Sequence, residues 1–379
     1  MKTFILFFIL FALSGLNFAQ PIPADSLYMG QIPPGEIPKI FSLPVTKGYF
    51  AAERIAISED GKEIYYTESN GYSPTSKNRI RLLRYSNNNW NKPITLFEGP
   101  GCPALSYDGN YLFENGLYSI KTDRGWSMPV WFLNRQHQFH YLQDTYSGTF
   151  YVAAKNALDK VGEMDWSKII INKSDTLVQS LGLPLNTPPN NMDFFISGDE
   201  SYIIIASRGL KISFNKKDGT WTNPKSLGPN INSFLGEWGP YVTKDNKYLF
   251  FTAGTKKDYS DTYVRWVRID NLISSLRFTN FIPWIKSPIP NKSFIKGSFI
   301  QFQIPENSFI DDDGNNTLHY SATLNNANRL PVWLKFDPET RIFSGRATEA
   351  GEFNIKVTAT DNANASVTCV FIIKVIDIH

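Results

Sequence analysis

A short turn-containing unit recurs five times between residues 58 and 251, at 58–66, 106–113, 146–152, 197–204 and 243–251. The first copy reads Ser-Glu-Asp-Gly-Lys-Glu-Ile-Tyr-Tyr, and the third is the weakest because it lacks the Asp. The central turn positions 60, 108, 147, 199 and 245 are spaced by 48, 39, 52 and 46 residues. A period of this length predicts that each copy belongs to one supersecondary unit and that the units share a continuous core.

Each copy has the pattern of a β-hairpin. An apolar strand such as 54–57 leads into Asp-Gly or its equivalent, which favours positive φ and a tight turn, and an aromatic-rich strand returns. Three Trp-x-x-Pro segments, 90–93, 126–129 and 221–224, lie between copies. Proline belongs at a sheet edge, so these segments indicate outer strands. Four strands in each unit predict the blades of a β-propeller.

The expected number of blades is five, with six as the alternative. The segment 37–41 resembles an outer strand without a blade of its own and is expected to pair with 263–267 and close the ring, which would remove exposed sheet edges. The alternative stays open because the irregular stretch from Val161 to Pro189 is long enough to contain further strands.

The five turn-containing units, with Trp-x-x-Pro and Leu-Gly-Pro-Asn-Ile-Asn-Ser (227–233) between them, resemble the WD40-like (PD40/TolB-type) β-propeller repeat proteins of bacterial envelopes. The resemblance covers about Pro34 to Asp270 and is most specific from Asn191 to Thr252. It implies a propeller with a central binding pocket, and one function it suggests is a TolB-like periplasmic component of an envelope complex.

The sequence pattern changes after Asp270, and several prolines occur within 281–290, as in a linker. Short alternating strands follow over a length typical of an immunoglobulin-like sandwich. Within them, 330–345 (Leu-Pro-Val-Trp-Leu through Phe-Ser-Gly), Gly351-Glu352-Phe353 and Val357–Asp361 resemble the dystroglycan-type cadherin-like domain, a family with an immunoglobulin-like fold. The predicted fold is therefore all-β: a propeller at 21–280 and a cadherin/Ig-like β-sandwich at 281–379.

The cadherin-like resemblance implies a possible calcium ion. Its candidate ligands are Glu306, Asp311, Asp313 and Asp361, because Ca²⁺ takes six to eight oxygen ligands and several are usually carboxylates. The competing interpretation is that Asp-Asp-Asp-Gly-Asn-Asn at 311–316 is a solvated turn. No other cofactor is expected.

The N-terminal segment 1–20 predicts a cleaved secretory signal, since Lys2 precedes an apolar run from Phe4 to Leu16. We therefore expect a periplasmic, cell-surface or extracellular protein without a transmembrane segment in its mature chain. The formal charge of +3 is close to neutral and gives no reason to expect nucleic acid as a partner. Cys102 and Cys369 fall in different domains and are expected to be buried and unpaired.

No catalytic constellation is evident, so we expect a non-catalytic protein. His137 and His140 are three residues apart, which on a strand places them on opposite faces and disfavours a shared metal. Cys102 with a histidine is too little to indicate a nucleophile. A glycan-active, sialidase-like propeller enzyme is the alternative, for which Arg54, Arg135 and Arg208 lie near inner-strand positions.

Trp238 and Tyr241 are the candidate ligand-binding residues, because both could stack on a sugar, although packing between blades is the favoured role for them. The predicted function is an exported binding or scaffold protein that recognises a protein or a carbohydrate at the cell envelope.

Overall fold

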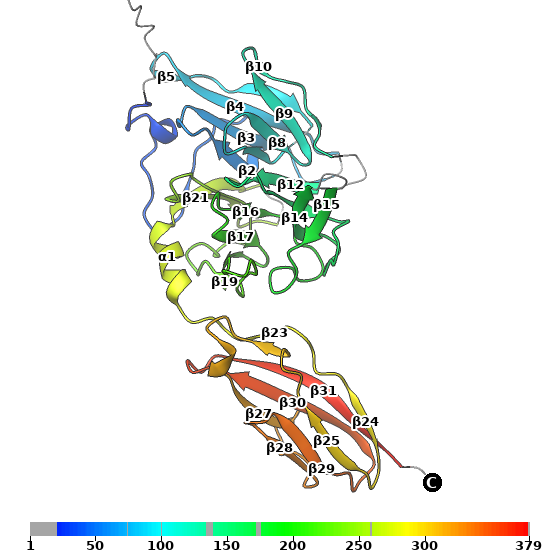
Figure 1. The fold of residues 1–379 in the computed structure, drawn as a ribbon. Helices are drawn as coiled ribbons and strands as arrows, with labels where there is room; N and C mark the ends of the chain where they lie inside the picture. The colour runs from blue at the N-terminus through cyan, green and yellow to red at the C-terminus, as the bar shows by residue number, and fades with distance from the viewer. Residues whose placement is uncertain are drawn as a thin grey trace, which may run out of the picture.

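The computed structural model describes residues 21–73, 75–99, 101–133, 139–171, 176–257 and 260–377. The predicted signal segment, Arg135 and His137 lie outside these ranges. Figure 1 shows two bodies built of strands, an N-terminal propeller and an elongated C-terminal sandwich, with helix α1 (Asp270–Phe278) beside the connection between them. The protein is all-β, as predicted. In the described residues no helix is long and apolar enough to cross a membrane.

Five antiparallel sheets make up the propeller, and each runs outward from an innermost strand. The first two are β2 (Phe50–Ile57), β3 (Glu63–Ser69), β4 (Asn78–Ser86), β5 (Asn89–Trp90) and β6 (Ile94–Glu98), then β7 (Pro103–Leu105), β8 (Tyr111–Glu114), β9 (Leu117–Thr122), β10 (Gly125–Trp126) and β11 (Val130–Trp131). The next two are β12 (Phe139–Asp144), β13 (Phe150–Ala154), β14 (Asp165–Ile171) and β15 (Thr176–Ser180), then β16 (Phe194–Ile196), β17 (Tyr202–Ala206), β18 (Leu210–Phe214) and β19 (Lys225–Ser226).

The fifth sheet joins the two ends of the propeller. It contains β20 (Gly236–Val242), β21 (Tyr248–Gly254) and β22 (Tyr263–Arg268), and its outer edge is β1 (Lys39–Ile40). Lys39 pairs with Trp266 and Ile40 with Arg265. The predicted closure by the N-terminal strand is therefore confirmed. The next residue, Phe41, is 2% exposed and packs edge-on against Phe250 with ring centroids 5.0 Å apart.

The blade count of five holds for the described chain. The stretch from Val161 to Pro189, which could have concealed a sixth blade, contributes β14 and β15 to the third sheet. The innermost strands contact one another in the cyclic order β2, β7, β12, β16, β20 and back to β2. Buried apolar clusters fill the spaces between neighbouring blades, so the ring is held by packing as well as by the β1 pairing.

The repeated turn has the same local structure in all five blades. The residue after the turn centre is left-handed in each copy, at Gly61, Gly109, Gly148, Glu200 and Asn246. In the copies with Asp at the centre, a hydroxyl two residues before it also binds the turn carboxylate, as in Ser58 Oγ to Asp60 Oδ1 (2.7 Å) and Thr243 Oγ1 to Asp245 Oδ1 (2.6 Å). These side chains mimic a backbone turn, which is why Ser or Thr and Asp recur at this spacing.

The C-terminal body is a two-layer sandwich. One layer is ordered β24 (Lys292–Ile295), β31 (Ser366–Ile376), β30 (Gly351–Thr360), β27 (His319–Leu324), and the other β25 (Phe299–Gln303), β29 (Ile342–Arg346), β28 (Leu334–Asp337). A small two-stranded sheet is formed by β23 (Trp284–Ile285) and β26 (Phe309–Ile310). Alternate residues of β30, namely Ile355, Val357 and Ala359, are buried between the layers, while their neighbours are partly or fully exposed. This period of two is the pattern from which the sandwich was predicted.

Candidate functional site: the axial pocket of the propeller

Five residues in equivalent positions of the repeat meet at the propeller axis. Each precedes its turn centre by six positions, and together they are Arg54, Cys102, Tyr141, Asp193 and Gly239. The contacts between them cross from blade to blade: the Arg54 guanidinium lies 4.3 Å from the ring centroid of Tyr141, and the Gly239 amide donates to Asp193 Oδ2 at 3.0 Å. We call these five residues the axial ring.

Irregular backbone in the inner strands turns side chains toward this axis. β2, β12 and β20 each carry a register shift at the axial ring. Left-handed φ values accompany them at Glu53 (62°), Tyr141 (56°) and Gly239 (62°), and Cys102 has the same conformation (62°) just before β7. A non-glycine residue in this region is strained, and such strain is commonly found at binding and catalytic sites.

A pocket of about 670 Å³ opens at the end of the propeller where the inner strands begin. Its volume is in the range of small-molecule sites. Its lining combines carboxylates, an imidazole, aromatic rings and two lysines, namely Glu53, Tyr72, His140, Met192, Asp193, Leu235, Gly236, Trp238, Gly254, Lys256 and Lys257. Trp238 Nε1 donates to the Tyr72 hydroxyl at 3.1 Å, and the two rings meet nearly at right angles (77°).

Hydrogen bonds tie the polar groups of the pocket floor together. His140 Nε2 lies 2.9 Å from Asp193 Oδ1. The Tyr141 hydroxyl lies 3.2 Å from both Glu53 Oε2 and Asp193 Oδ2. A hydroxyl has one proton to donate, so Tyr141 can donate to only one of these two carboxylates at a time.

The two carboxyl groups have opposite pKa shifts. Burial and the charge of Asp193 raise the pKa of Glu53 to about 7. Burial alone would raise the pKa of Asp193 as well, but the hydrogen bond and charge of His140 lower it below its ordinary value. At neutral pH, Asp193 is therefore the ionised partner, whereas Glu53 readily takes a proton.

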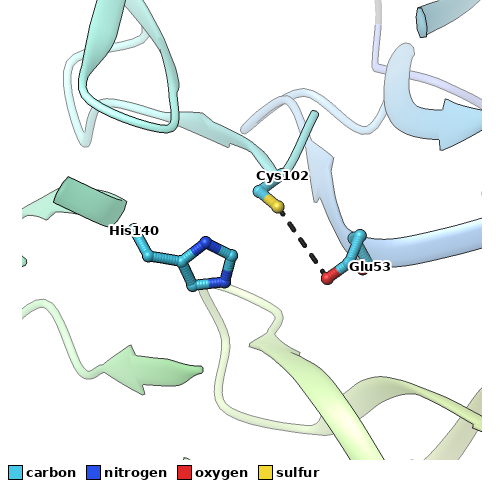
Figure 2. Close-up of side chains that lie close together, drawn as sticks. All are labelled: Glu53, Cys102 and His140. Carbon is cyan, nitrogen blue, oxygen red and sulfur yellow. Dashed lines mark hydrogen bonds between the residues drawn. The ribbon is translucent and has the colours of Figure 1, made fainter. Parts of the chain in front are cut away.

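The basic and sulfur groups of the floor respond to the same surroundings. Burial by itself would lower the pKa of His140, but the hydrogen bond and charge of Asp193 raise it overall. Burial and the charge of Glu53 raise the pKa of the Cys102 thiol well above its usual value. Without a further ligand the thiol is therefore protonated, and it donates to Glu53 Oε2 at 3.8 Å. Figure 2 shows Cys102, Glu53 and His140 converging from three different segments of the ring.

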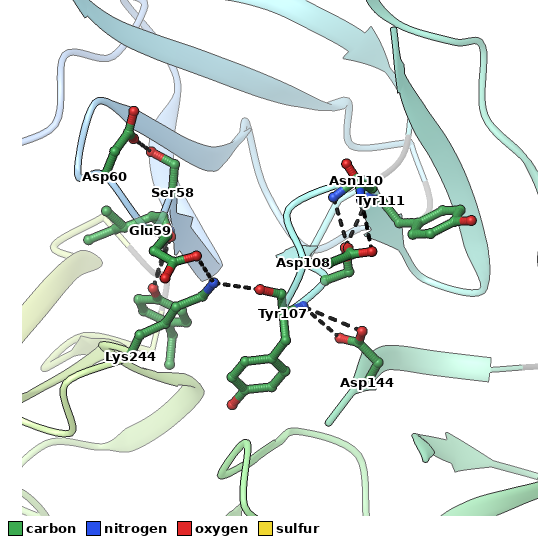
Figure 3. Close-up of polar contacts among 12 residues, drawn as sticks. Ser58, Glu59, Asp60, Tyr107, Asp108, Asn110, Tyr111, Asp144 and Lys244 are labelled. Carbon is green, nitrogen blue, oxygen red and sulfur yellow. Dashed lines mark hydrogen bonds and ion pairs between the residues drawn. The ribbon is translucent and has the colours of Figure 1, made fainter. Parts of the chain in front are cut away.

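The opposite end of the axis is closed by side chains of the repeated turns (Figure 3). Lys244 Nζ donates to the Tyr107 carbonyl at 2.7 Å and pairs with Glu59 Oε2 at 3.3 Å. The ring of Tyr107 packs against Tyr146 with centroids 4.3 Å apart. The space left between this plug and Arg54 is about 30 Å³, so the axis is a pocket with a floor and a ligand would enter from the Trp238 side.

The structure separates the two predicted ligand-binding aromatics. Trp238 is half-buried and forms part of the pocket wall. Tyr241 packs between blades, where its hydroxyl lies 3.3 Å from the Ile57 amide and carbonyl and its ring contacts Phe195 and Phe250. The packing role considered for both residues therefore describes Tyr241.

The candidate arginines for a sialidase-like site do not meet at the pocket among the described residues. Arg54 is 1% exposed beneath Tyr141, where its Nη2 donates to the Leu142 carbonyl at 3.2 Å. Arg208 lines a neighbouring cavity that also contains Asn190, Asn232 and Glu237. Arg135 lies outside the described residues.

The predicted calcium ligands lie where the sandwich meets the propeller. Asp313 Oδ2 accepts the Phe281 amide at 2.6 Å, and Asp361 Oδ2 accepts Asn280 Nδ2 at 2.8 Å, so both hold the connecting segment. Asp311 is buried and accepts Thr317 Oγ1, whereas the Glu306 side chain is exposed. No three of these four carboxylates approach one another within 4.8 Å. They do not form a cation cage in this arrangement, and calcium binding there stays a prediction.

A carboxylate that the sequence interpretation left out fixes this junction. The Asp312 side chain is fully buried; its Oδ1 pairs with Lys216 Nζ at 3.0 Å and its Oδ2 accepts the Asn223 amide. Lys225, in the same part of the fourth blade, donates to the Leu276 and Thr279 carbonyls at the end of α1. The turn 216–219 of the propeller is thus a docking point for the sandwich.

Comparison with known protein families bears on the C-terminal part of the chain. The family model described as "Putative Ig domain" matches residues 283–376. The C-terminal unit is an Ig-like domain. Neither a WD40 nor a cadherin family model matches the chain, so the finer cadherin-like assignment rests on the sequence resemblance alone. No curated protein matches the chain.

Solved structures resemble the chain only distantly. TolB from Acinetobacter baumannii is 13% identical, covering 57% of this chain and 54% of its own, with a TM-score of 0.34. The extracellular domain of a "putative hybrid two component system" from B. thetaiotaomicron is 11% identical over 89% of this chain and 46% of its own (TM-score 0.35). A "putative alpha-galactosidase" from Bacteroides fragilis is 26% identical over 24% of this chain, which spans 17% of that protein (TM-score 0.20).

Sequence reasoning missed most of the pocket. Residue type alone gives no reason to select Glu53, Tyr141 or Asp193; the sequence predicts that Cys102 is buried and disfavours His140 as a metal ligand. The available signal was the register of the repeat, because the position six residues before each turn centre carries Arg, Cys, Tyr, Asp and Gly in the five copies. Side chains of such different chemistry in one structural position are not what a uniformly packed core requires.

Proposed function

We propose that this protein is an exported binding protein whose axial pocket takes a small carbohydrate ligand. The observation that carries the proposal is the pairing of an aromatic corner, Trp238 and Tyr72, with the carboxylates of Glu53 and Asp193 across one pocket. Ligand sites typically combine apolar walls with a few placed polar groups. A sugar ring offers an apolar face of C–H groups and several hydroxyl donors, which match these two kinds of wall.

The electrostatics of the pocket favour a neutral or basic sugar at the floor. Asp193 is ionised and already accepts from His140 and the Gly239 amide, and Glu53 competes with it for the Tyr141 proton. Each carboxylate oxygen can accept more than one hydrogen bond, so hydroxyl groups of a ligand would add donors to those already present at Glu53 and Asp193. Arg54 is covered by Tyr141, so it is not presented to a ligand carboxylate.

Export is part of the proposal and rests on the sequence of residues 1–20. The Ig-like domain would act as a spacer or as an adhesive module, and the Asp312 junction would hold it in a fixed direction from the pocket. The place of action would be the periplasm, the cell surface or the exterior, with a protein partner of the envelope as the alternative to a free glycan.

Thermal unfolding of the mature protein with a panel of neutral, amino and acidic mono- to tetrasaccharides tests the proposal. A ligand at 100 times its Kd stabilises the native state by about 2.7 kcal/mol. We expect a raised midpoint with a neutral or amino sugar that is lost in Trp238→Ala and retained in Trp131→Ala, an exposed tryptophan on β11. An unchanged midpoint with every sugar, or a shift that survives Trp238→Ala, would contradict it.

Hydrolysis of a bound glycoside is the second candidate. Glu53 Oε2 and Asp193 Oδ2 each lie 3.2 Å from the Tyr141 hydroxyl, so their separation is no more than twice that distance. Retaining glycosidases place two carboxyl groups about 5–5.5 Å apart. Incubating the stabilising saccharide with the protein and analysing the products separates the two functions, since a binding protein returns the sugar intact.

A further inference from the structure

Three side chains at the floor of the axial pocket carry three different metal-binding atoms. A carboxylate oxygen of Glu53, the Sγ atom of Cys102 and a ring nitrogen of His140 all lie within 4.8 Å of one another. In Figure 2 the three point toward a common space between β2, the segment before β7 and β12. Within the described part of the chain this is the one group of three or more such side chains that satisfies this distance.

The measured separation between two of the ligand atoms is close to that in a tetrahedral zinc site. Zinc bonds of about 2.0–2.1 Å to oxygen and nitrogen and 2.3 Å to sulfur place neighbouring ligand atoms about 3.5 Å apart. The separation of Cys102 Sγ from Glu53 Oε2 is 3.8 Å. The His140 ring nitrogen lies within 4.8 Å of both atoms, so a bound metal would draw it closer to them.

A second carboxylate orients the histidine. His140 Nε2 is held at 2.9 Å by Asp193 Oδ1, which leaves Nδ1 as the nitrogen for a metal. Histidine ligands commonly use their second nitrogen to bind a carboxylate, which fixes the ring and its tautomer. Asp193 is itself fixed by the Gly239 amide at 3.0 Å, so the support extends to the fifth blade.

The charges at the floor balance when a divalent cation is added. Metal binding releases the thiol proton to solvent, which gives three negative groups: Glu53, the Cys102 thiolate and Asp193. Arg54, 1% exposed and within 3.5 Å of the Cys102 carbonyl, supplies one positive charge. A divalent cation supplies the other two, and a neutral cluster is the least costly one to bury.

We propose that Glu53, Cys102 and His140 bind a zinc-class divalent transition metal, with Asp193 as the group that orients His140. Sulfur and imidazole ligands favour this class over Ca²⁺ or Mg²⁺. Three protein ligands leave a fourth position that a water molecule or a ligand oxygen would fill, and two of the three, Glu53 and His140, line the axial pocket. With the metal bound, Glu53 would be a ligand and could not serve as the acid of the hydrolytic candidate.

Cobalt titration of tag-free, chelator-treated protein tests this site, because Co²⁺ reports both coordination number and thiolate ligation in its visible and near-ultraviolet absorption. We expect one equivalent to bind with the intense bands of a tetrahedral site and a thiolate-to-cobalt charge-transfer band. One equivalent of Zn²⁺ should then displace it.

Matched variants locate the metal. Cys102→Ser should abolish the charge-transfer band, and His140→Gln and Asp193→Asn should each weaken binding at least tenfold, in line with about 10–100-fold for a lost supporting group. Cys369→Ser, in the sandwich, and His319→Gln, at an exposed histidine, should bind cobalt as the parent protein does.

Two results would overturn the proposal. One is that the parent protein binds no stoichiometric Co²⁺ or binds it without a thiolate band. This result does not depend on the folding of any variant. The other is a thiolate band that persists in Cys102→Ser. Neither result bears on sugar binding, which is measured separately in the presence of chelator.

Discussion

Gly239 of β20 packs directly against the backbone of Glu53 in β2, where the fifth blade meets the first. A Cβ atom at position 239 would lie 2.5 Å from the Glu53 carbonyl carbon and 2.7 Å from the Arg54 nitrogen. Because backbone atoms cannot move aside as a flexible side chain can, only glycine fits there. This close approach holds the left-handed Glu53 in place and brings its carboxylate to the axis.

Gly239→Ala should therefore destabilise the propeller beyond the cost of its backbone conformation. Gly219→Ala is the matched control, since Gly219 also has positive φ but has open space around it. A left-handed alanine costs about 1–2 kcal/mol, and overpacking adds about 1–3 kcal/mol. Urea unfolding should rank the variants in that order, and equal losses would show that the contact with Glu53 is not tight.

Phe41→Ala should open the ring closure. Phe41 is buried against Phe250 and Trp266 beside the β1–β22 pairing, and truncating a buried phenylalanine costs about 3–5 kcal/mol. Ile40→Ala, at an exposed neighbour in β1, should cost less than about 1 kcal/mol. Chemical denaturation measures both, and a mild effect of Phe41→Ala would mean that the propeller holds together without this closure.

Asp312→Ala should loosen the sandwich from the propeller without unfolding either. It leaves Lys216 Nζ and the Asn223 amide without their acceptor, a loss of about 1–3 kcal/mol at the junction. Small-angle X-ray scattering should show a broader distribution of interdomain distances. Glu306→Ala, at an exposed carboxylate of the same domain, should leave the scattering unchanged; identical profiles for both variants would show that Asp312 does not hold the junction.

Glu114 should make stability depend on pH in an unusual direction. It is fully buried, its Oε2 has no hydrogen-bond partner, and burial raises its pKa from 4.5 to about 8. Between those values the unfolded chain ionises this group while the folded chain keeps it protonated, so stability falls as pH rises from about 4.5 to 8.

The fall attributable to Glu114 is up to about 4 kcal/mol, and Glu114→Gln should remove it. Denaturation at pH 5 and pH 8 measures the difference, with Glu163→Gln, at an exposed glutamate, as the control. Parallel pH profiles for the parent protein and Glu114→Gln would contradict the assignment.

Turn chemistry and strand alternation were enough to predict the architecture. The Asp-Gly turns and the Trp-x-x-Pro segments can each be recognised within a few residues of sequence. A partner could be assigned to strand 37–41 because the ring of a propeller must close. The pocket was harder, because Glu53 and Asp193 are far apart in the chain and ordinary in type. Glu53 reaches the axis at a register shift in β2 that only the folded ring reveals, and both carboxylates depend on burial that no pattern of charge encodes.

For the carboxylates at the domain junction, the sequence revealed the residue types but not their role. Asp311, Asp313 and Asp361 matched the oxygen chemistry of a calcium site, but their oxygens accept hydrogen bonds from the interdomain segment and from neighbouring turns. An aspartate can serve either as a calcium ligand or as a hydrogen-bond acceptor at a domain junction. The choice depends on which donors the neighbouring domain presents, and those are set by tertiary structure.

A crystal structure of the protein with its most stabilising saccharide would test the axial pocket most directly. We expect density for the sugar against the Trp238 ring, with hydroxyls within hydrogen-bond distance of Glu53 and Asp193. Density on the Ig-like domain or at the turn end of the axis, with the Trp238 pocket filled only by solvent, would contradict it.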